Sequence, residues 1–503
     1  MSGPPLGIAT PTPLARQPGF AADVLLVSTY ELGHQPLLLA QAQAALRQAG
    51  HRVRCVDLAV EEPEALVAGL AGAELIAIAV PMHTAARLAI ALAERLRAAA
   101  PSAHLSLFGL YASELSASVD AASDSRLVDS LIGGEFEPAL VALAAGVAAR
   151  APRVVPREVA PPAGVEPDAP APAFPRQRFA VPDRAGLPSL DRYAHCDTGG
   201  ELVLAGYVET SRGCAHRCTH CPLTPVYGGR LRLVDREVVL ADAAQLIEAG
   251  TRHLTFGDPD FLNAVPHSLA IVEELARSHA GVTFDATIKV EHLLEHEALL
   301  PRLRDAGLLF VTSAFESTSD RVLAELEKGH VAADLERALA ATRDHGIALR
   351  PTWVAFTPWG TLDDYRAMLD FVARHGLAGA APAVQYALRL LLPPGSPLVP
   401  RIEAAGLLDG FDAAGLTYRW HHPDPRMERL ATEAGAIVEA DVGASTGAAD
   451  HDHRRPAAAT AEVLARLRDA AVAAAGETPV PRPPAHEAAP PPFVPGLTES
   501  WFC

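Results

Sequence analysis

The sequence is short of cysteine, and it has no leader-like segment at its start. Only 6 of its 503 residues are cysteine. The first twenty residues show no charged region followed by an apolar core, so no secretory signal peptide is predicted. Thiols stay reduced inside cells. We therefore expect a cytoplasmic protein whose cysteines bind metals or remain free, rather than a disulfide-stabilised one.

Long apolar runs and an excess of positive charge are also absent. The most apolar stretch, residues 71–91, is interrupted by Pro81, His83 and Arg87, so no membrane-spanning helix is predicted. The formal net charge is −18, which disfavours broad binding to nucleic-acid phosphates. A hydrophobic content of 49% over 503 residues is enough for more than one buried core.

Half of the cysteines lie in one short stretch. Cys214, Cys218 and Cys221 have the spacing C-x3-C-x2-C, and three such thiolates can bind three irons of a [4Fe-4S] cluster while the fourth iron stays open. A structural zinc site is the alternative, with His216 or His220 as the fourth ligand. No second Cys/His pair follows at zinc-finger spacing, so the pattern favours a cluster.

The motif, with a strand-like segment before it and a turn-rich segment and a helix after it, resembles the radical S-adenosylmethionine (SAM) enzymes. In that family the three cysteines hold the cluster, SAM chelates the open iron, and one electron breaks a carbon–sulfur bond. The resemblance implies a [4Fe-4S] cluster and SAM as cofactors. It also implies an electron donor such as flavodoxin or ferredoxin, and a small-molecule or peptide substrate. His220 matches a position near the adenine.

The chain before the motif predicts a separate α/β domain. Buried-strand and helical patterns alternate from residue 23 to 108, which predicts a doubly wound, Rossmann-like sheet. This half resembles the cobalamin-binding domain of one branch of the family, most specifically at Val128–Glu137. The cobalt-ligating Asp-x-His-x-x-Gly motif is absent, since the loop reads Ser28-Thr-Tyr-Glu-Leu-Gly-His34. The resemblance implies cobalamin as a third cofactor; a domain that binds nothing is the alternative.

Composition and pattern predict four parts. Residues 1–150 are the cobalamin-binding-like domain, 151–195 a Pro/Ala-rich linker with a lead-in that docks on the next domain, 196–440 a radical SAM partial (β/α)6 barrel with a helical end, and 441–503 a low-complexity tail. The sixth barrel strand is expected at Ala383–Leu391.

Four residues at predicted strand ends match binding positions of the family. Gly257 and Asp258 stand where the family has a Gly-Gly-Glu motif that holds the methionine amino group, although this sequence departs from that motif. Glu316 and Ser317 resemble an acid–serine pair near the ribose and the methionine carboxylate. A carboxylate can accept hydrogen bonds from both ribose hydroxyls.

Two further residues complete the predicted binding set. Arg321 is expected to pair with the methionine carboxylate, with a surface salt bridge as the alternative, and Val354 is expected to line the adenine pocket. No residue is assigned a catalytic role from the sequence.

The sequence ends in an aromatic-flanked cysteine, Cys503. The end resembles a radical SAM subgroup with Cys-selenocysteine-Ala-Glu-Pro or Cys-Cys-Ala-Glu-Pro tails. This resemblance implies a selenoprotein whose gene continues through a UGA codon. A second hypothesis for the whole chain is a non-catalytic iron–sulfur or zinc sensor or carrier with a thiol-exchanging tail.

Overall fold

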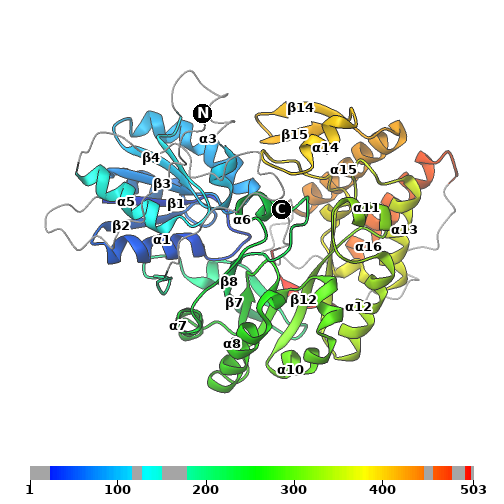
Figure 1. Ribbon diagram of the computed structural model, residues 1–503, viewed down its shortest axis with the longest axis horizontal. Helices are drawn as coiled ribbons and strands as arrows, with labels where there is room; N and C mark the ends of the chain where they lie inside the picture. The colour runs from blue at the N-terminus through cyan, green and yellow to red at the C-terminus, as the bar shows by residue number, and fades with distance from the viewer. Residues whose placement is uncertain (1–22, 116–126, 150–177, 447–456, 479–492, 500–503) are drawn as a thin grey trace, which may run out of the picture. The chain divides into compact units, whose positions relative to one another are not determined.

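The computed structural model describes residues 23–115, 127–149, 178–446, 457–478 and 493–499. The chain divides into two compact units (Figure 1). The first comprises the chain up to Arg192 together with Ala413–Leu416, and the second comprises Tyr193–Asp412 and the chain from Thr417 onward. The division falls inside the predicted lead-in segment.

The first unit is a doubly wound α/β fold, as predicted. Its parallel sheet has the order β2-β1-β3-β4-β5. The strands are β1 (Asp23–Ser28), β2 (Arg52–Asp57), β3 (Leu75–Ala79), β4 (His104–Phe108) and β5 (Ser130–Ile132), and the helices are α1 (Leu37–Gln48), α2 (Pro63–Leu70), α3 (His83–Ala99) and α5 (Glu137–Ala148). Helices α1 and α5 cover one apolar face, and α2 and α3 the other. Both faces are buried, which explains the continuous apolar runs of the central strands.

The lead-in segment docks on the first unit, which corrects the expectation that it docks on the second. The side-chain amide of Gln43 donates to the carbonyls of Asp183 and Ala185, each at 2.8 Å. Gln35 donates to the carbonyl of Pro188 at 2.8 Å. Because a proline-rich segment has few N–H groups with which to join a sheet, glutamine side chains supply the donors that its carbonyls need.

The second unit is built on a seven-stranded sheet of order β13-β12-β11-β10-β7-β6-β16. Its strands are β6 (His195–Asp197), β7 (Leu202–Val208), β10 (His253–Phe256), β11 (Thr283–Thr287), β12 (Leu308–Glu316), β13 (Ala348–Trp353) and β16 (Gly496–Leu497). Strands β7 and β10 to β13 are parallel and form a curled half-barrel (Figure 1). Two ribbons stand outside this sheet: β8 (Ser211–Gly213) with β9 (Leu231–Leu233), and β14 (Leu408–Asp412) with β15 (Thr417–Trp420).

Helices follow the parallel strands of the half-barrel. They are α6 (Leu223–Tyr227), α7 (Arg236–Glu248), α8 (Val265–Ser278), α9 (Val290–Glu295), α10 (Leu300–Asp305), α11 (Asp320–Glu325), α12 (Ala332–Asp344), α13 (Leu362–Arg374), α14 (Val399–Ala404), α15 (Pro425–Thr446) and α16 (Ala457–Ala474). Across the described parts of both units, no helix is long and apolar enough to cross a bilayer.

The partial barrel is confirmed, but the sixth strand predicted at Ala383–Leu391 is not formed: five parallel strands and one bridge are present. The start of the expected segment, Ala383–Tyr386, is a short 3-10 helix, and only Phe356 and Arg389 pair beyond it. The side-chain oxygen of Gln385 accepts from the backbone N–H of Trp353 at 2.9 Å. A side chain thus satisfies the edge of β13 where a strand was expected.

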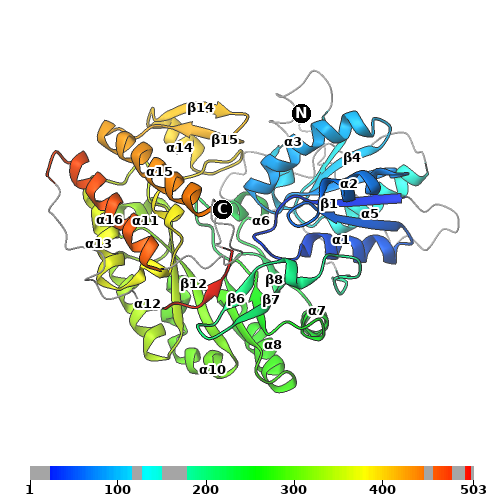
Figure 2. The same ribbon diagram turned by 180° about the vertical axis from the view of Figure 1, so that it is seen from behind.

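The predicted low-complexity tail contains folded elements. Helix α16 packs on α13 and α15, and β16 pairs antiparallel with β6 (Figure 2). Arg350 on β13 donates to the carbonyl of Pro495 at 3.0 Å. A Cβ atom at Gly496 would lie 2.5 Å from the Arg350 guanidinium, so a larger residue there would displace this side chain. The two edges of the curled sheet therefore meet through this strand. Cys503 lies outside the described residues.

Candidate active site

The cysteine loop, residues 214–222, follows β7 through the short strand β8. Its first turn depends on Gly213, which has a φ of 74°. A Cβ atom at this position would lie 2.3 Å from the carbonyl oxygen of Arg230. Only glycine accepts both the left-handed backbone and this close approach. The glycine directly before the first cysteine therefore fixes where the loop begins.

Asp258 holds this loop from the carboxyl end of β10. Its Oδ1 accepts from the hydroxyls of Thr210 at 2.7 Å and Ser211 at 2.5 Å, and its Oδ2 accepts from the backbone N–H of Thr210 at 3.0 Å. Burial raises the pKa of Asp258 despite these hydrogen bonds. Gly257 has no room for a side chain, because a Cβ atom would lie 2.0 Å from the Tyr207 hydroxyl. Both residues position the loop, and a contact of Asp258 with the methionine amino group remains a prediction.

The three thiols of the loop are free and lie in a buried environment. Cys218 is buried, while Cys214 and Cys221 are half-buried. Burial first, and then the neighbouring Cys218 and Cys214, raise the pKa of Cys221 to about 12. Asn263 donates from Nδ2 to the sulfur of Cys214 at 3.4 Å. Crowded thiols of this kind favour binding a metal centre, which stabilises their thiolate form.

The geometry does not favour the zinc alternative. In the described part of the chain, two groups of three possible metal-ligand atoms lie within 4.8 Å of one another, and neither contains a cysteine sulfur. Ligands of one tetrahedral zinc lie closer, at about 3.8 Å between sulfurs. The two candidate fourth ligands also face carboxylates: Nε2 of His216 lies 3.5 Å from Asp260, and Nε2 of His220 lies 3.3 Å from Glu316.

Glu316, the last residue of β12, is the centre of a buried charge cluster. It has a left-handed φ of 61°, and its Oε1 lies 3.2 Å from Nζ of Lys328 and 3.3 Å from Nε2 of His220. Burial by itself would raise the pKa of Glu316, but Lys328 and His220 outweigh it and hold the pKa at about 2. Glu316 is therefore an ionised carboxylate beside the cysteine loop.

Lys328 is the functional residue that the sequence did not indicate. Its side chain is only 4% exposed, and the carboxylate of Glu316 and the thiols of Cys218 and Cys221 raise its pKa against the effect of burial. The positive charge of Lys328 also lowers the pKa of Cys221, although burial raises that pKa by more. A fixed cation thus faces both the acid and the predicted cluster ligands. A Lys-Gly pair after a helix was its only signal in the sequence.

The other predicted residues divide into those near Glu316 and one that is remote from it. Val354 donates its backbone N–H to the carbonyl of Glu316 at 3.0 Å, and Ser317 is buried beside it. Arg321 is exposed on α11, so the structure does not bring this arginine into the cluster. The pairing of Arg321 with the methionine carboxylate stays a prediction.

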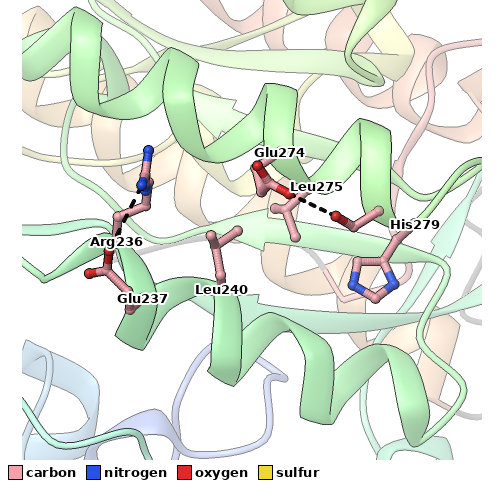
Figure 3. A pocket seen from close by; sticks show the side chains of 7 residues that line it. Arg236, Glu237, Leu240, Glu274, Leu275 and His279 are labelled. Atoms are coloured by element: carbon pink, nitrogen blue, oxygen red, sulfur yellow. Dashed lines mark hydrogen bonds and ion pairs between the residues drawn. The ribbon is translucent and has the colours of Figure 1, made fainter.

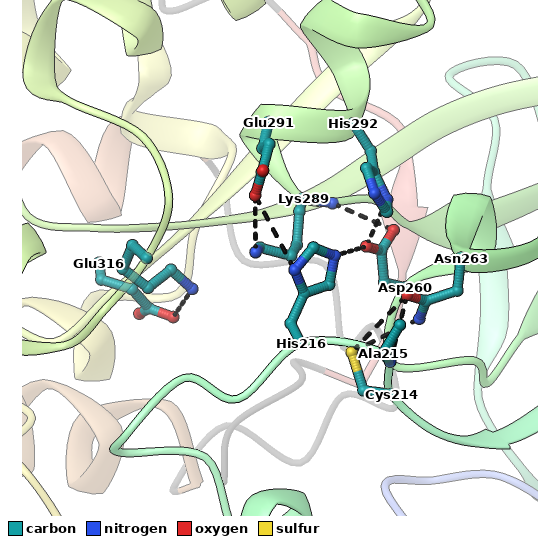
Figure 4. A network of polar contacts seen from close by, with 10 residues as sticks. Cys214, Ala215, His216, Asp260, Asn263, Lys289, Glu291, His292 and Glu316 are labelled. Carbon is teal, nitrogen blue, oxygen red and sulfur yellow. Dashed lines mark hydrogen bonds and ion pairs between the residues drawn. The ribbon is translucent and has the colours of Figure 1, made fainter. Parts of the chain in front are cut away.

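A second carboxylate, Asp260, lies on the other side of the cysteine loop (Figure 4). Its Oδ2 is 2.7 Å from Nδ1 of His292 and 3.5 Å from Nε2 of His216. Burial would raise the pKa of Asp260, but the two histidines outweigh it and lower the pKa, while Asp260 raises the pKa of His292. Lys289 donates from its backbone N–H to Oδ1 at 3.4 Å.

The first unit places its own candidate site at the carboxyl ends of β1 and β3. Strands β1 and β3 are neighbours in the sheet, but the chain leaves β1 toward one edge of the sheet and leaves β3 toward the other. Doubly wound sheets bind ligands at such a point, where the strand order reverses. After β1 the backbone turns through Leu32 and Gly33, with φ of 52° and 70°. His34 is buried, and Glu31 accepts from the N–H of Leu37 at 2.9 Å. The loop is ordered without the cobalt-ligating motif.

A shallow pocket elsewhere contains none of the predicted binding residues (Figure 3). It lies between α7 and α8 and is lined by Arg236, Glu237, Leu240, Glu274, Leu275, Ser278 and His279.

The sequence profile of the Radical SAM superfamily matches residues 208–372. These residues are a radical SAM domain. They contain the cysteine loop and both buried carboxylates, so the domain marks the chain as an enzyme and confirms the family resemblance of its motif. Its relatives do not test the selenocysteine prediction.

Curated relatives match only this part of the chain. The ribosomal protein uS12 methylthiotransferase RimO of Thermus thermophilus is 28% identical over 188 residues, which are 33% of this chain and 42% of that protein. The same enzyme of Aeromonas salmonicida is also 28% identical over 188 residues, covering 33% and 41%. The chain thus spans about two-fifths of the length of these curated relatives.

Solved structures match over a larger part of the chain. The radical SAM methyltransferase TsrM from Kitasatospora setae, with tryptophan and a SAM analogue bound, has a TM-score of 0.60 at 17% identity and covers 83% of this chain and 88% of its own. The cobalamin-dependent radical SAM enzyme OxsB, with aqua-cobalamin and SAM bound, has a TM-score of 0.62 at 15% identity, covering 89% and 71%. At such identities the likeness concerns the fold.

Proposed function

We propose that the chain binds a [4Fe-4S] cluster through Cys214, Cys218 and Cys221 and cleaves SAM reductively. The observation that carries the proposal is the cysteine loop itself, with three crowded free thiols at the carboxyl end of a half-barrel strand. Three soft sulfur ligands in one short loop suit a cluster. When bound there, the cluster supplies the electron that breaks a carbon–sulfur bond of SAM.

The residues on the Glu316 side of the loop fit the nucleoside part of SAM. Glu316 is ionised and held by Lys328, and an ionised carboxylate accepts hydrogen bonds from ribose hydroxyls. His220 has a buried Nδ1 atom without a hydrogen-bond partner, and the half-buried Val354 adds apolar surface. We assign SAM orientation to these three residues.

The positive charge of Lys328 stabilises the thiolate form of the cysteines in the loop. A buried cation beside thiolates stabilises negative charge on them and on any centre that they hold. Lys328 lies near Cys218 and Cys221, so it favours uptake of an electron at this position. An electron donor such as flavodoxin or ferredoxin is the protein partner that we propose.

Cobalamin binding by the first unit is the second candidate function. The strand order β2-β1-β3-β4-β5 provides a ligand crevice beside β1 and β3, and the fold likeness to TsrM and OxsB covers this unit as well. We propose that methyl transfer is the reaction, because both TsrM and the RimO relatives are named for transfer of methyl-containing groups. Hydrogen abstraction from the substrate is the alternative.

The test is anaerobic reconstitution with iron, sulfide and cobalamin, followed by addition of SAM and a strong reductant. We expect 5′-deoxyadenosine in wild type and none in Cys218→Ala, measured by mass spectrometry. Labelled cobalamin retained after gel filtration tests the first unit. Lack of SAM cleavage by protein with a full complement of cluster iron would reject the enzyme and favour the sensor or carrier.

A further inference from the structure

Three metal-ligating side chains converge beside the cysteine loop, from three separate elements. His216 belongs to the loop, Asp260 follows β10, and His292 lies on α9. One ligand atom from each lies within 4.8 Å of the other two. Figure 4 shows the three side chains pointing toward one another. No cysteine takes part, so this group is distinct from the proposed cluster ligands.

The contacts in this group are ion-pair contacts whose geometry does not meet that of a hydrogen bond. Nδ1 of His292 is 2.7 Å from Oδ2 of Asp260, and Nε2 of His216 is 3.5 Å from the same oxygen, yet none of these three atoms has a hydrogen-bond partner. Ligands of one metal at bond lengths of about 2.1 Å lie about 3.0–3.4 Å apart. The observed separations from the carboxylate oxygen lie on either side of this range.

Burial makes the unsatisfied atoms costly. The side chain of Asp260 is 0% exposed, and those of His216 and His292 are 21% and 14% exposed. A buried polar atom without a partner destabilises the fold by about 1–3 kcal/mol. A single cation at the convergence point would satisfy the carboxylate oxygen and the facing nitrogens of both imidazoles together.

The residues around His216, Asp260 and His292 contact them, but no side-chain cation among them pairs with Asp260 in the described part of the chain. Lys289 approaches Asp260 with its backbone N–H only, and its ammonium group lies 3.0 Å from Oε2 of Glu291. The same oxygen is 3.9 Å from Nδ1 of His216. Glu291 therefore offsets the lysine charge and faces the outer nitrogen of a ligating histidine, as carboxylates do around metal sites.

We propose that His216, Asp260 and His292 bind a divalent first-row transition metal ion at a site separate from the cysteines. Two imidazoles and one carboxylate suit zinc, iron, cobalt or nickel. Three protein ligands leave coordination positions open, and they lie on the strand-end side of the half-barrel where substrate is expected. The inference does not depend on SAM cleavage.

The test uses full-length protein with its cysteines either intact or replaced together by serine. After dialysis against Co²⁺ and removal of free ion, metal content is measured by mass spectrometry, and the cysteine-free variant is examined by visible absorption. We expect about one Co²⁺ per chain bound outside the cysteines, with d–d bands typical of nitrogen and oxygen ligands. Asp260→Asn and His292→Gln should each weaken binding at least tenfold.

His296→Gln is the matched control. His296 stacks near His292 with ring centroids 5.6 Å apart, and it forms an overlapping group with His292 and the exposed Glu295. The control should keep Co²⁺ binding. Loss in His296→Gln with retention in Asp260→Asn would overturn the proposal, as would absence of Co²⁺ from cysteine-free protein whose circular dichroism matches wild type.

Discussion

Two buried carboxylates of the radical SAM domain are neutralised in different ways. Glu316 has a cation tethered to the chain, because Nζ of Lys328 lies 3.2 Å away. Asp260 has two histidines at 2.7 and 3.5 Å, and neither imidazole is directed as a hydrogen bond. Both acids follow parallel strands of one sheet and face the same cysteine loop.

The difference separates a fixed charge from an exchangeable one. A lysine in the chain keeps Glu316 ionised whatever else is bound, which suits an acid that must accept hydrogen bonds from a cofactor. A histidine can face a carboxylate with a ring N–H, as an imidazolium, or through a shared metal ion. The same fold therefore offers one carboxylate paired with a lysine of the chain and one at which we propose that a cation binds.

The largest expected effect comes from removing the tethered cation. Lys328→Met leaves Glu316 charged and buried with only His220 beside it, and breaking a buried pair destabilises a protein by about 3–5 kcal/mol. Urea denaturation of purified protein measures the loss. In the double variant Glu316→Gln with Lys328→Met most of it should return, because no buried charge remains. A double variant as unstable as the single one would mean that Lys328 acts through packing.

Acid should weaken the Glu316 pair next. Its folded pKa of about 2 lies below the usual glutamate value, so the pair stabilises the fold above about pH 4.5 and this contribution is lost as the pH falls toward 2. Complete protonation of Glu316 removes roughly 3 kcal/mol, of which about 2 kcal/mol is lost by pH 3. Many other carboxylates titrate in this range, so the measurement is the difference between wild type and the double variant at pH 7 and pH 3. An equal acid response in both would contradict the assignment.

The sequence predicted the residues whose role follows from local spacing. Cys214, Cys218 and Cys221 are neighbours in one loop, and the strand ending at Glu316 is mostly apolar, which places its acid at the carboxyl end of the strand. The doubly wound first unit followed from periodicity in the same way. Each of these predictions needed only the residues of one element or one loop.

Residues that act through tertiary contact were missed or misplaced. Lys328 is twelve positions after Glu316, and a buried lysine looks like a solvated one in a sequence. Arg321 was expected at the site because it lies one turn after the acid, yet the short helix α11 turns it to solvent. The side chains of Asp260 and His292 meet only because adjacent strands end at one edge of the sheet. Nothing in the linear spacing indicates that meeting.

The smallest expected effect is at Lys289, and it tests the difference between the Asp260 and Glu316 sites. Lys289 is itself only 8% exposed, but its partner Glu291 is 39% exposed and stays in contact with water when the pair is broken. Lys289→Met should therefore cost about 1 kcal/mol in urea denaturation, less than Lys328→Met. The same change removes a positive charge beside Asp260 and frees Glu291 to face His216. Affinity for Co²⁺ should therefore rise about fivefold, in the direction opposite to Asp260→Asn. A loss of stability as large as that of Lys328→Met would show that both lysines neutralise a buried carboxylate to the same extent. An unchanged Co²⁺ affinity would show that the charge of Lys289 does not affect metal binding by the three ligands.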